Sequence, residues 1–128
     1  MVTNIFDQPI LTSVKKALGI NEDDSSFDPD ILLHVNGSLG DINQVGVGNP
    51  LMVQEGETWN DFLPIQQSQR ELIGFVIQYV SIKTKIMFDP PAPSTLTVMD
   101  STAKEILWRI EFGRRDKEEF YNESAPVG

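Results

Sequence analysis

The residues that could do chemistry are few in this sequence and lie far apart. The chain of 128 residues contains no cysteine and one histidine, His34. Nucleophilic catalysis needs a serine, threonine or cysteine held beside a general base. No such residue stands near His34 in the spacing of a known catalytic motif, and His34 itself is expected to be exposed. We therefore predict that the chain has no catalytic residues and is not an enzyme.

Carboxylates offer the next candidate chemistry. Glu22, Asp23 and Asp24 form an acidic cluster that could attract calcium. A calcium loop also needs alternating oxygen ligands, a central glycine and a terminal bidentate glutamate, and these are missing. The segment 45–48 carries two glycines but lacks the spacing and lysine of a phosphate-binding loop. The acidic cluster is predicted to be a solvated loop, with no metal and no cofactor bound.

Charge disfavours nucleic acid as a partner. The chain has 10 basic and 19 acidic residues and a formal charge of −9. No basic residue occurs between Lys16 and Arg70, whereas acidic residues recur throughout that range. Phosphate neutralisation needs lysine and arginine, and a recognition helix over 28–44 would have none. One end of the folded protein is expected to be strongly negative.

Length and hydropathy define the class of protein. With 40% hydrophobic and 23% charged residues, the sequence is typical of a globular chain, and residues 1–128 are predicted to form a single domain. No apolar run reaches the length of a membrane span, and the N-terminal residues lack the pattern of a signal peptide. We expect a soluble protein with no membrane partner, cytoplasmic when it is made.

Periodic apolar residues predict an all-α fold, a small bundle of four main helices. The first helix spans residues 10–18 and is closed by Gly19, and the second spans 29–44, with Asp28 as its cap. Gly37 and Gly40 interrupt the second helix, which indicates close packing against a neighbour, local weakness, or both.

A long central helix is predicted from Ser68 to Phe88. Ser68 and Glu71 have the spacing of a capping box, and apolar residues follow at helical spacing. Residues 80–88 also alternate with a period of two, so a strand remains the alternative there. The prolines at 90, 91 and 93 must end this element. A fourth helix is expected to begin between Ser94 and Thr97 and to stop at Gly113.

The segments outside these helices supply the candidate contacts. Trp59 and Phe62 are expected to anchor a single helical turn in the core, and Trp108 to be an anchor in the core or at a subunit interface. An irregular loop at 46–56 and a flexible tail at 113–128 are the predicted partner-binding segments. Their candidate contact residues are Val47, Leu51, Met52, Arg114, Arg115, Phe120 and Tyr121.

Two motifs give the sequence a family resemblance. Phe88-Asp89-Pro90-Pro91, followed by a helix that closes on Leu107-Trp108-Arg109, resembles the head-tail connector proteins, also called head completion or adaptor proteins, of tailed bacteriophages. The order of elements extends this resemblance over residues 10–112. The motif residues Phe88, Asp89, Pro90, Pro91 and Trp108 are expected to be structural.

The resemblance implies a structural virion protein at the head-tail junction. Such subunits would form a homo-oligomeric ring on the portal protein, complete the DNA-filled head and bind a tail-proximal connector or tail terminator protein. DNA would pass through the channel without specific binding, and assembly would occur in the host cytoplasm. The alternative is a small helical DNA-binding or packaging-associated phage protein.

Overall fold

Every regular element of the described chain is a helix. The computed structural model describes residues 4–64 and 68–124, with the side chains of residues 68 and 117–124 left out. Its elements are the 3₁₀ turn η1 (Ile5–Asp7), α1 (Ile10–Leu18), α2 (Asp28–Gln44), α3 (Trp59–Phe62), the 3₁₀ turn η2 (Ser68–Leu72), α4 (Ile73–Phe88) and α5 (Pro93–Ser124). The predicted all-α fold is confirmed.

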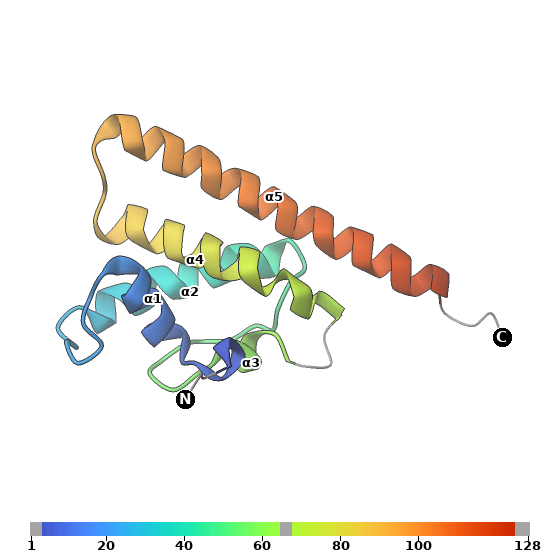
Figure 1. The fold of residues 1–128 in the computed structure, drawn as a ribbon, viewed down its shortest axis with the longest axis horizontal. Helices are drawn as coiled ribbons and strands as arrows, with labels where there is room; N and C mark the ends of the chain where they lie inside the picture. The colour runs from blue at the N-terminus through green and yellow to red at the C-terminus, as the bar shows by residue number, and fades with distance from the viewer. Residues whose placement is uncertain (1–3, 65–67, 125–128) are drawn as a thin grey trace.

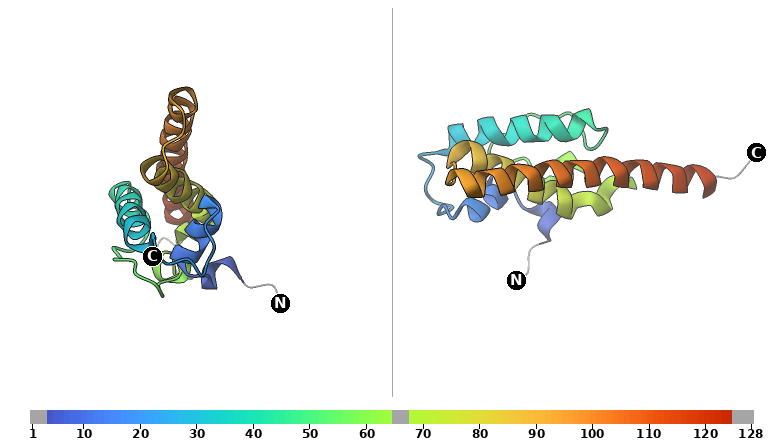
Figure 2. Two further views of the ribbon diagram at one scale, coloured as in Figure 1. Left: turned by 90° about the vertical axis from the view of Figure 1, so that its left-hand side faces the viewer. Right: turned by 90° about the horizontal axis from the view of Figure 1, so that it is seen from above.

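Helix α4 lies at the centre of the bundle. α2 and α5 both pack along it, and α1 packs against α4 and α2. Figure 1 shows α5 folding back over α4 after a sharp corner, and then extending past the rest of the molecule. In the view from above in Figure 2, α2 runs along one edge of the body and α5 lies across its middle. The helices α1, α2 and α5 are therefore arranged around α4.

The ambiguous segment 80–88 is helical throughout. Val80 and Thr84 are buried one turn apart in α4, so the core selects the helical period and excludes the strand alternative. The start of this helix differs from the prediction, because Ser68 to Leu72 form a 3₁₀ turn and the α-helix begins at Ile73. The side chain of Gln69 in that turn accepts from the Gly48 N–H and donates to the Gly46 carbonyl, both in the loop after α2. These two hydrogen bonds hold the turn against the loop.

The prediction that Gly113 ends the last helix is wrong, because α5 continues to Ser124. A lone glycine costs only about 1 kcal/mol against alanine in a helix, and no proline follows until Pro126. A Cβ atom at Gly113 would lie 2.6 Å from Cδ2 of Leu72, so the glycine permits close helix packing. The predicted flexible tail at 113–128 is thus helical as far as 124, and the remainder lies outside the described residues.

A buried lysine organises the acidic loop between α1 and α2. Lys15 Nζ donates to the carbonyl oxygens of Glu22 (3.0 Å) and Asp24 (2.6 Å) and lies 2.9 Å from Asp28 Oδ1. A cation this deeply buried needs such partners to offset its lost hydration. Phe27, not Asp28, is the N-cap of α2, because Asp28 lies inside the first turn, where it pairs with Lys15.

The predicted anchors Trp59 and Phe62 are both fully buried. Thr58 and Asp61 form a capping box around α3. The indole Nε1 of Trp59 donates to Ser13 Oγ of α1 at 2.9 Å, which satisfies its polar atom inside the core. A single helical turn thereby fixes the loop segment against α1.

Candidate functional site

The loop at 46–56 is packed onto the bundle. Val47 is fully buried, Leu51 is half-buried against the core, and Met52 is 70% exposed. The prediction that Val47 contacts a partner is therefore wrong, whereas Met52 is available. Asn43 holds the buried part of the loop, because its Nδ2 lies within 3.0 to 3.3 Å of the carbonyl oxygens of residues 47, 48 and 49.

A second asparagine of α2 holds the far end of the same loop. Asn36 Oδ1 accepts from the backbone N–H of Val53 at 2.8 Å, and its Nδ2 donates back to the Val53 carbonyl at 3.1 Å. These bonds replace the β-pairing that an irregular loop lacks, so its backbone polar groups are satisfied while its apolar side chains enter the core. Polar residues of α2 thus bury a loop that its composition alone suggested was exposed.

The side chain of Arg114 makes a hydrogen bond within the subunit. Its Nε donates to the Val45 carbonyl at 2.7 Å, and its side chain lies against Gly46, where a Cβ atom would come within 2.7 Å of Arg114 Cδ. Arg114 therefore lies in a helix that is linked to the end of α2, not in a flexible tail, and its contact with a partner stays a prediction. Arg115 is exposed and pairs with Glu111 at 2.7 Å. Phe120 and Tyr121 belong to α5, but their side chains lie outside the described residues.

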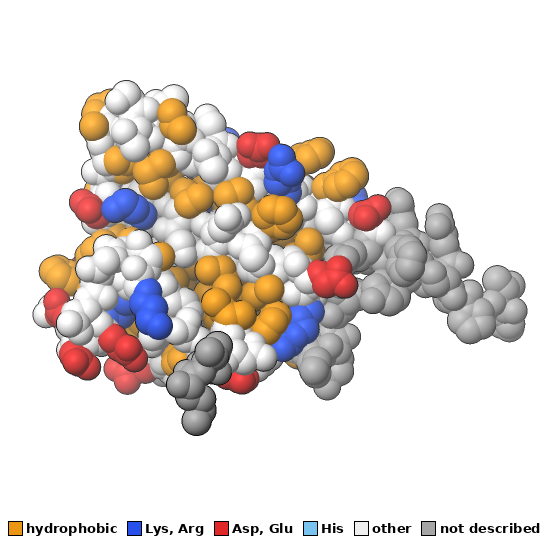
Figure 3. All heavy atoms as spheres, in the orientation of Figure 1, with side chains coloured by type: hydrophobic (Ala, Val, Ile, Leu, Met, Phe, Trp, Pro, Cys, Tyr) orange, Lys and Arg blue, Asp and Glu red, His pale blue; other side chains and the backbone are white. Residues whose placement is uncertain are grey.

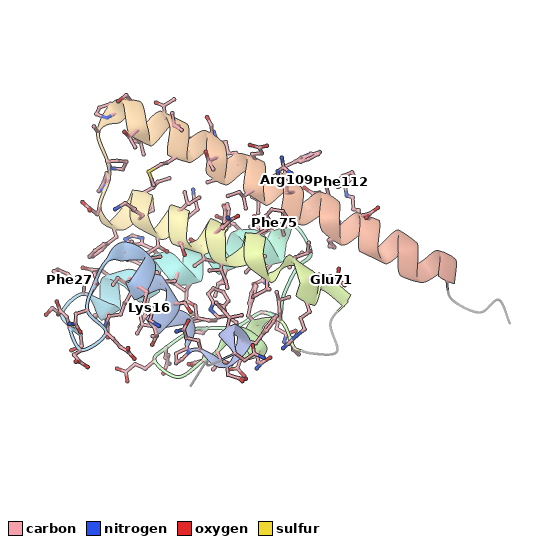
Figure 4. The ribbon with its side chains drawn as sticks, in the orientation of Figure 1. Lys16, Phe27, Glu71, Phe75, Arg109 and Phe112 are labelled. Atoms are coloured by element: carbon pink, nitrogen blue, oxygen red, sulfur yellow. The ribbon has the colours of Figure 1, made fainter. Side chains whose placement is uncertain are left out.

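Trp108 and Phe112 form an exposed aromatic ridge on α5. They are 60% and 57% exposed. Their rings stack with centroids 5.3 Å apart and an interplanar angle of 18°. Figure 4 shows Phe112 on the edge of α5 that faces away from α4, with Arg109 beside it. Trp108 is therefore not a core anchor of the subunit, and the interface alternative is the one that remains.

The Phe88-Asp89-Pro90-Pro91 motif forms the corner between α4 and α5. The ring of Phe88 meets Phe27 edge to face, with centroids 5.4 Å apart. The Asp89 N–H donates to the Lys85 carbonyl and closes α4. Pro90 and Pro91 then cannot continue the helix, and α5 begins at Pro93. The motif turns the chain sharply enough for α5 to pack back on α4.

A surface groove between α2 and α4 was missed by the sequence interpretation. It encloses about 230 Å³ and is lined by Leu33, His34, Gly37, Ser38, Asp41, Lys83 and Met87. Leu33 and Met87 are 69% and 56% exposed. We call this hollow the α2–α4 groove. The available signal was Leu33, which lies off the buried stripe of its helix and has Gly37 one turn later.

A part-buried hydrogen bond to Asp41, which lines this groove, joins the two helices. The hydroxyl of Tyr79 donates to Asp41 Oδ2 at 2.7 Å. Burial, reinforced by the Asp41 carboxylate, raises the pKa of Tyr79 above its ordinary value, so the phenol stays protonated and remains a donor. The bond links α4 to α2 beside the groove.

The side chains that could bind a metal ion are scattered in the described part of the chain. Among residues 4–64 and 69–116, whose side chains the structure describes, no three His, Asp or Glu side chains are grouped as a metal site would need. No helix in that part is long and apolar enough to cross a membrane. Exposed apolar side chains on α2, α4 and α5, among them Leu33, Met87, Trp108 and Phe112, are the surfaces that could contact other macromolecules.

Comparison with known families shows which class of protein this is. A family model described as phage connector protein matches residues 10–117, and the chain belongs to this family. The family is structural, and its match contains both the corner motif and the aromatic ridge. No curated protein sequence and no solved structure shows significant similarity to the chain.

Proposed function

We propose that this protein is a head-tail connector subunit that forms a ring on the portal vertex. The ring completes the DNA-filled head and provides the adaptor for tail attachment. Its partners are other copies of the chain, the portal protein, and a tail-proximal connector or tail terminator protein. The family match over residues 10–117 is the observation that carries the proposal.

The shape of the subunit suits such a role. A bundle of α1, α2 and α4 gives a compact body, and α5 extends beyond it as a rigid arm (Figure 1). Assembly onto a larger ring needs surfaces that remain apolar after the subunit has folded. Trp108, Phe112, Leu33, Met87 and Met52 meet this requirement. We assign the end of this arm, which continues to Ser124, to contact with a neighbouring ring.

The charge distribution suits a channel for DNA. Acidic side chains gather at the end of the molecule that carries the loop after α1 (Figure 3). Phosphates repel carboxylates, so a channel wall built from this end would not hold the DNA as it passes. We assign the acidic loop to the channel side on this electrostatic ground.

The alternative of a DNA-binding phage protein has less support. α2 has no lysine or arginine. On α5, Lys104, Arg109 and Arg115 each pair with a carboxylate four residues earlier. These pairs reduce the charge available for phosphates. A gel shift at low ionic strength that vanishes with added salt would support the alternative.

Complementation of assembly tests the proposed function. Phage made without this protein should accumulate DNA-filled heads and separate tails, and the purified protein should join them. Electron microscopy of virions with an N-terminal tag on the chain should place the label at the head-tail junction. A label elsewhere on the particle, or normal joining without the protein, would contradict the proposal.

A further inference from the structure

The pair Asn36-Gly37 lies in the middle of α2 and is the only asparagine followed by glycine in the chain. An asparagine in this position can lose its side-chain amide, because glycine has no Cβ atom to hinder attack by its own backbone nitrogen. The nitrogen of Gly37 forms a bond to Cγ of Asn36, the bond from Cγ to Nδ2 breaks, and ammonia leaves with the Gly37 amide proton. Water then opens the resulting five-membered imide and gives aspartate or isoaspartate at position 36.

The folded helix blocks this reaction at both reacting groups. In an α-helix the N–H of residue 37 donates to the carbonyl oxygen four residues earlier, so the nitrogen of Gly37 is not free to attack. The side chain of Asn36 is also held in place. Its Nδ2 donates to the carbonyl oxygens of Leu32 at 2.9 Å and Val53 at 3.1 Å, and its Oδ1 accepts from the Val53 N–H at 2.8 Å. Conversion of Asn36 therefore requires α2 to open around Gly37.

The composition of α2 favours local opening at this point. Glycine is the least favourable helix residue after proline, and α2 contains both Gly37 and Gly40. A Cβ atom at either glycine would meet nothing in the described chain within 4 Å, so close packing requires neither of them. Ser38 Oγ donates to the His34 carbonyl at 2.9 Å, in competition with the hydrogen bonds of the helix itself. Because α2 also runs along one edge of the body (Figure 2), it can open without displacing the other helices.

We propose that Asn36 is a deamidation site that reacts when α2 opens locally, and that the reaction releases the loop at 46–56. Aspartate at position 36 places a carboxylate oxygen where Nδ2 now donates, so it faces the carbonyl oxygens of Leu32 and Val53 without a proton to share. Isoaspartate adds a methylene group to the backbone of α2 and breaks the regular spacing of its hydrogen bonds. The loop carries the exposed side chain of Met52, so its release changes a surface available for contact.

Peptide mass spectrometry of the folded and the urea-unfolded protein, held at the same mildly alkaline pH, measures the reaction. In the unfolded chain position 36 should convert faster than any other asparagine, because each of the others precedes a larger residue. In the folded protein it should convert about 10 to 100 times more slowly, as expected for local opening that costs less than global unfolding. Equal rates in the two samples would overturn the proposal. So would the absence of product in the folded protein after about 100 half-times of the unfolded reaction.

Alanine substitutions show whether α2 alone or the whole protein must open. Gly40→Ala keeps the reacting pair and strengthens α2, so it should slow the reaction of the folded protein by up to about fivefold and leave the unfolded rate unchanged. Gly74→Ala makes the same change in α4, also at a glycine with free space around it in the described chain, and should leave both rates unchanged. Equal effects of the two substitutions, including none, would overturn the proposal. Gly37→Ala should suppress the reaction even in the unfolded chain.

Hydrogen exchange tests the release of the loop. The converted protein carries an additional negative charge, so anion exchange separates it from the unconverted protein. Amide exchange over residues 47–53 should be about 5 to 150 times faster in the converted protein, the factor expected when buried polar groups lose their partner. Asn36→Asp should have an effect in the same direction, whereas Asn21→Asp adds the same charge in the exposed acidic loop and should have none. Unchanged exchange in the converted protein would overturn the proposed release.

Discussion

The ring of Phe62 occupies the space that any side chain at Gly48 would need. A Cβ atom at Gly48 would lie 2.3 Å from Cζ of Phe62, and the glycine has a φ of +79°. Gly48→Ala should therefore lower the free energy of unfolding by about 2 to 4 kcal/mol, because strain and overpacking add. Gly37→Ala is the control, with free space and a helical backbone, and should gain up to about 1 kcal/mol. Urea unfolding of both variants measures the difference, and equal stabilities would contradict it.

Lys15 should be far more important for stability than its neighbour Lys16. Lys15→Met removes a buried cation and leaves the Asp28 carboxylate and two carbonyl oxygens without their donor. The expected loss is about 3 to 5 kcal/mol. Lys16 is exposed (Figure 4), so Lys16→Met should change stability by less than about 0.5 kcal/mol. Thermal unfolding followed by circular dichroism compares them, and a Lys15→Met variant as stable as wild type would disprove the role of the lysine.

Truncation of the two tryptophans should lower the stability by very different amounts. Trp59 is fully buried, and Trp59→Ala should cost about 3 to 5 kcal/mol. Trp108 is mainly exposed and loses only its stacking on Phe112, so Trp108→Ala should cost about 0.5 to 1.5 kcal/mol. Guanidinium unfolding monitored by circular dichroism tests both. A cost for Trp108→Ala similar to that for Trp59→Ala would show that Trp108 belongs to the core.

Thr84 should be replaceable by valine with a gain in stability. Its Oγ1 is buried and has no hydrogen-bond partner in the described chain. Burial of an unpaired hydroxyl costs about 1 to 3 kcal/mol, and valine has nearly the same shape. Thr102→Val is the comparison, because Thr102 is exposed and bonds to the Val98 carbonyl. A clear loss of stability in Thr84→Val would mean that the hydroxyl has a partner in solution.

The end of α5 should contribute to docking on the portal ring more than to folding. Truncation after Asp116 removes Phe120 and Tyr121 and leaves the Arg114 contact with Val45 in place. The melting temperature should change little, whereas co-sedimentation with portal-bearing heads should fall. A ring presents many such ends together, which can raise affinity by about two to four orders of magnitude. Normal co-sedimentation of the truncated protein would move the docking surface elsewhere, with Met52 as the next candidate.

Local sequence determined the helices and the corner of this protein. The apolar spacing in α1, α2 and α4, the prolines after Phe88, and the capping box around α3 act over a few residues, so their outcome could be predicted. Trp59 and Phe62 were also predicted correctly as anchors. For residues 80–88 the sequence fitted both the helical period and the strand period of two, and packing against the core selected the helix.

Tertiary structure alone decided which surfaces remain exposed. Val47 is buried because Asn43, four residues earlier, and Asn36, which bonds to Val53 17 residues later, hold its loop against α2. Gly113 continues its helix because Leu72 packs against it, although a glycine at that position is a common stop signal. Trp108 is exposed because other residues of α5 face α4. The sequence carries the composition of each helix face, but only the packing of one helix on another determines which face meets solvent.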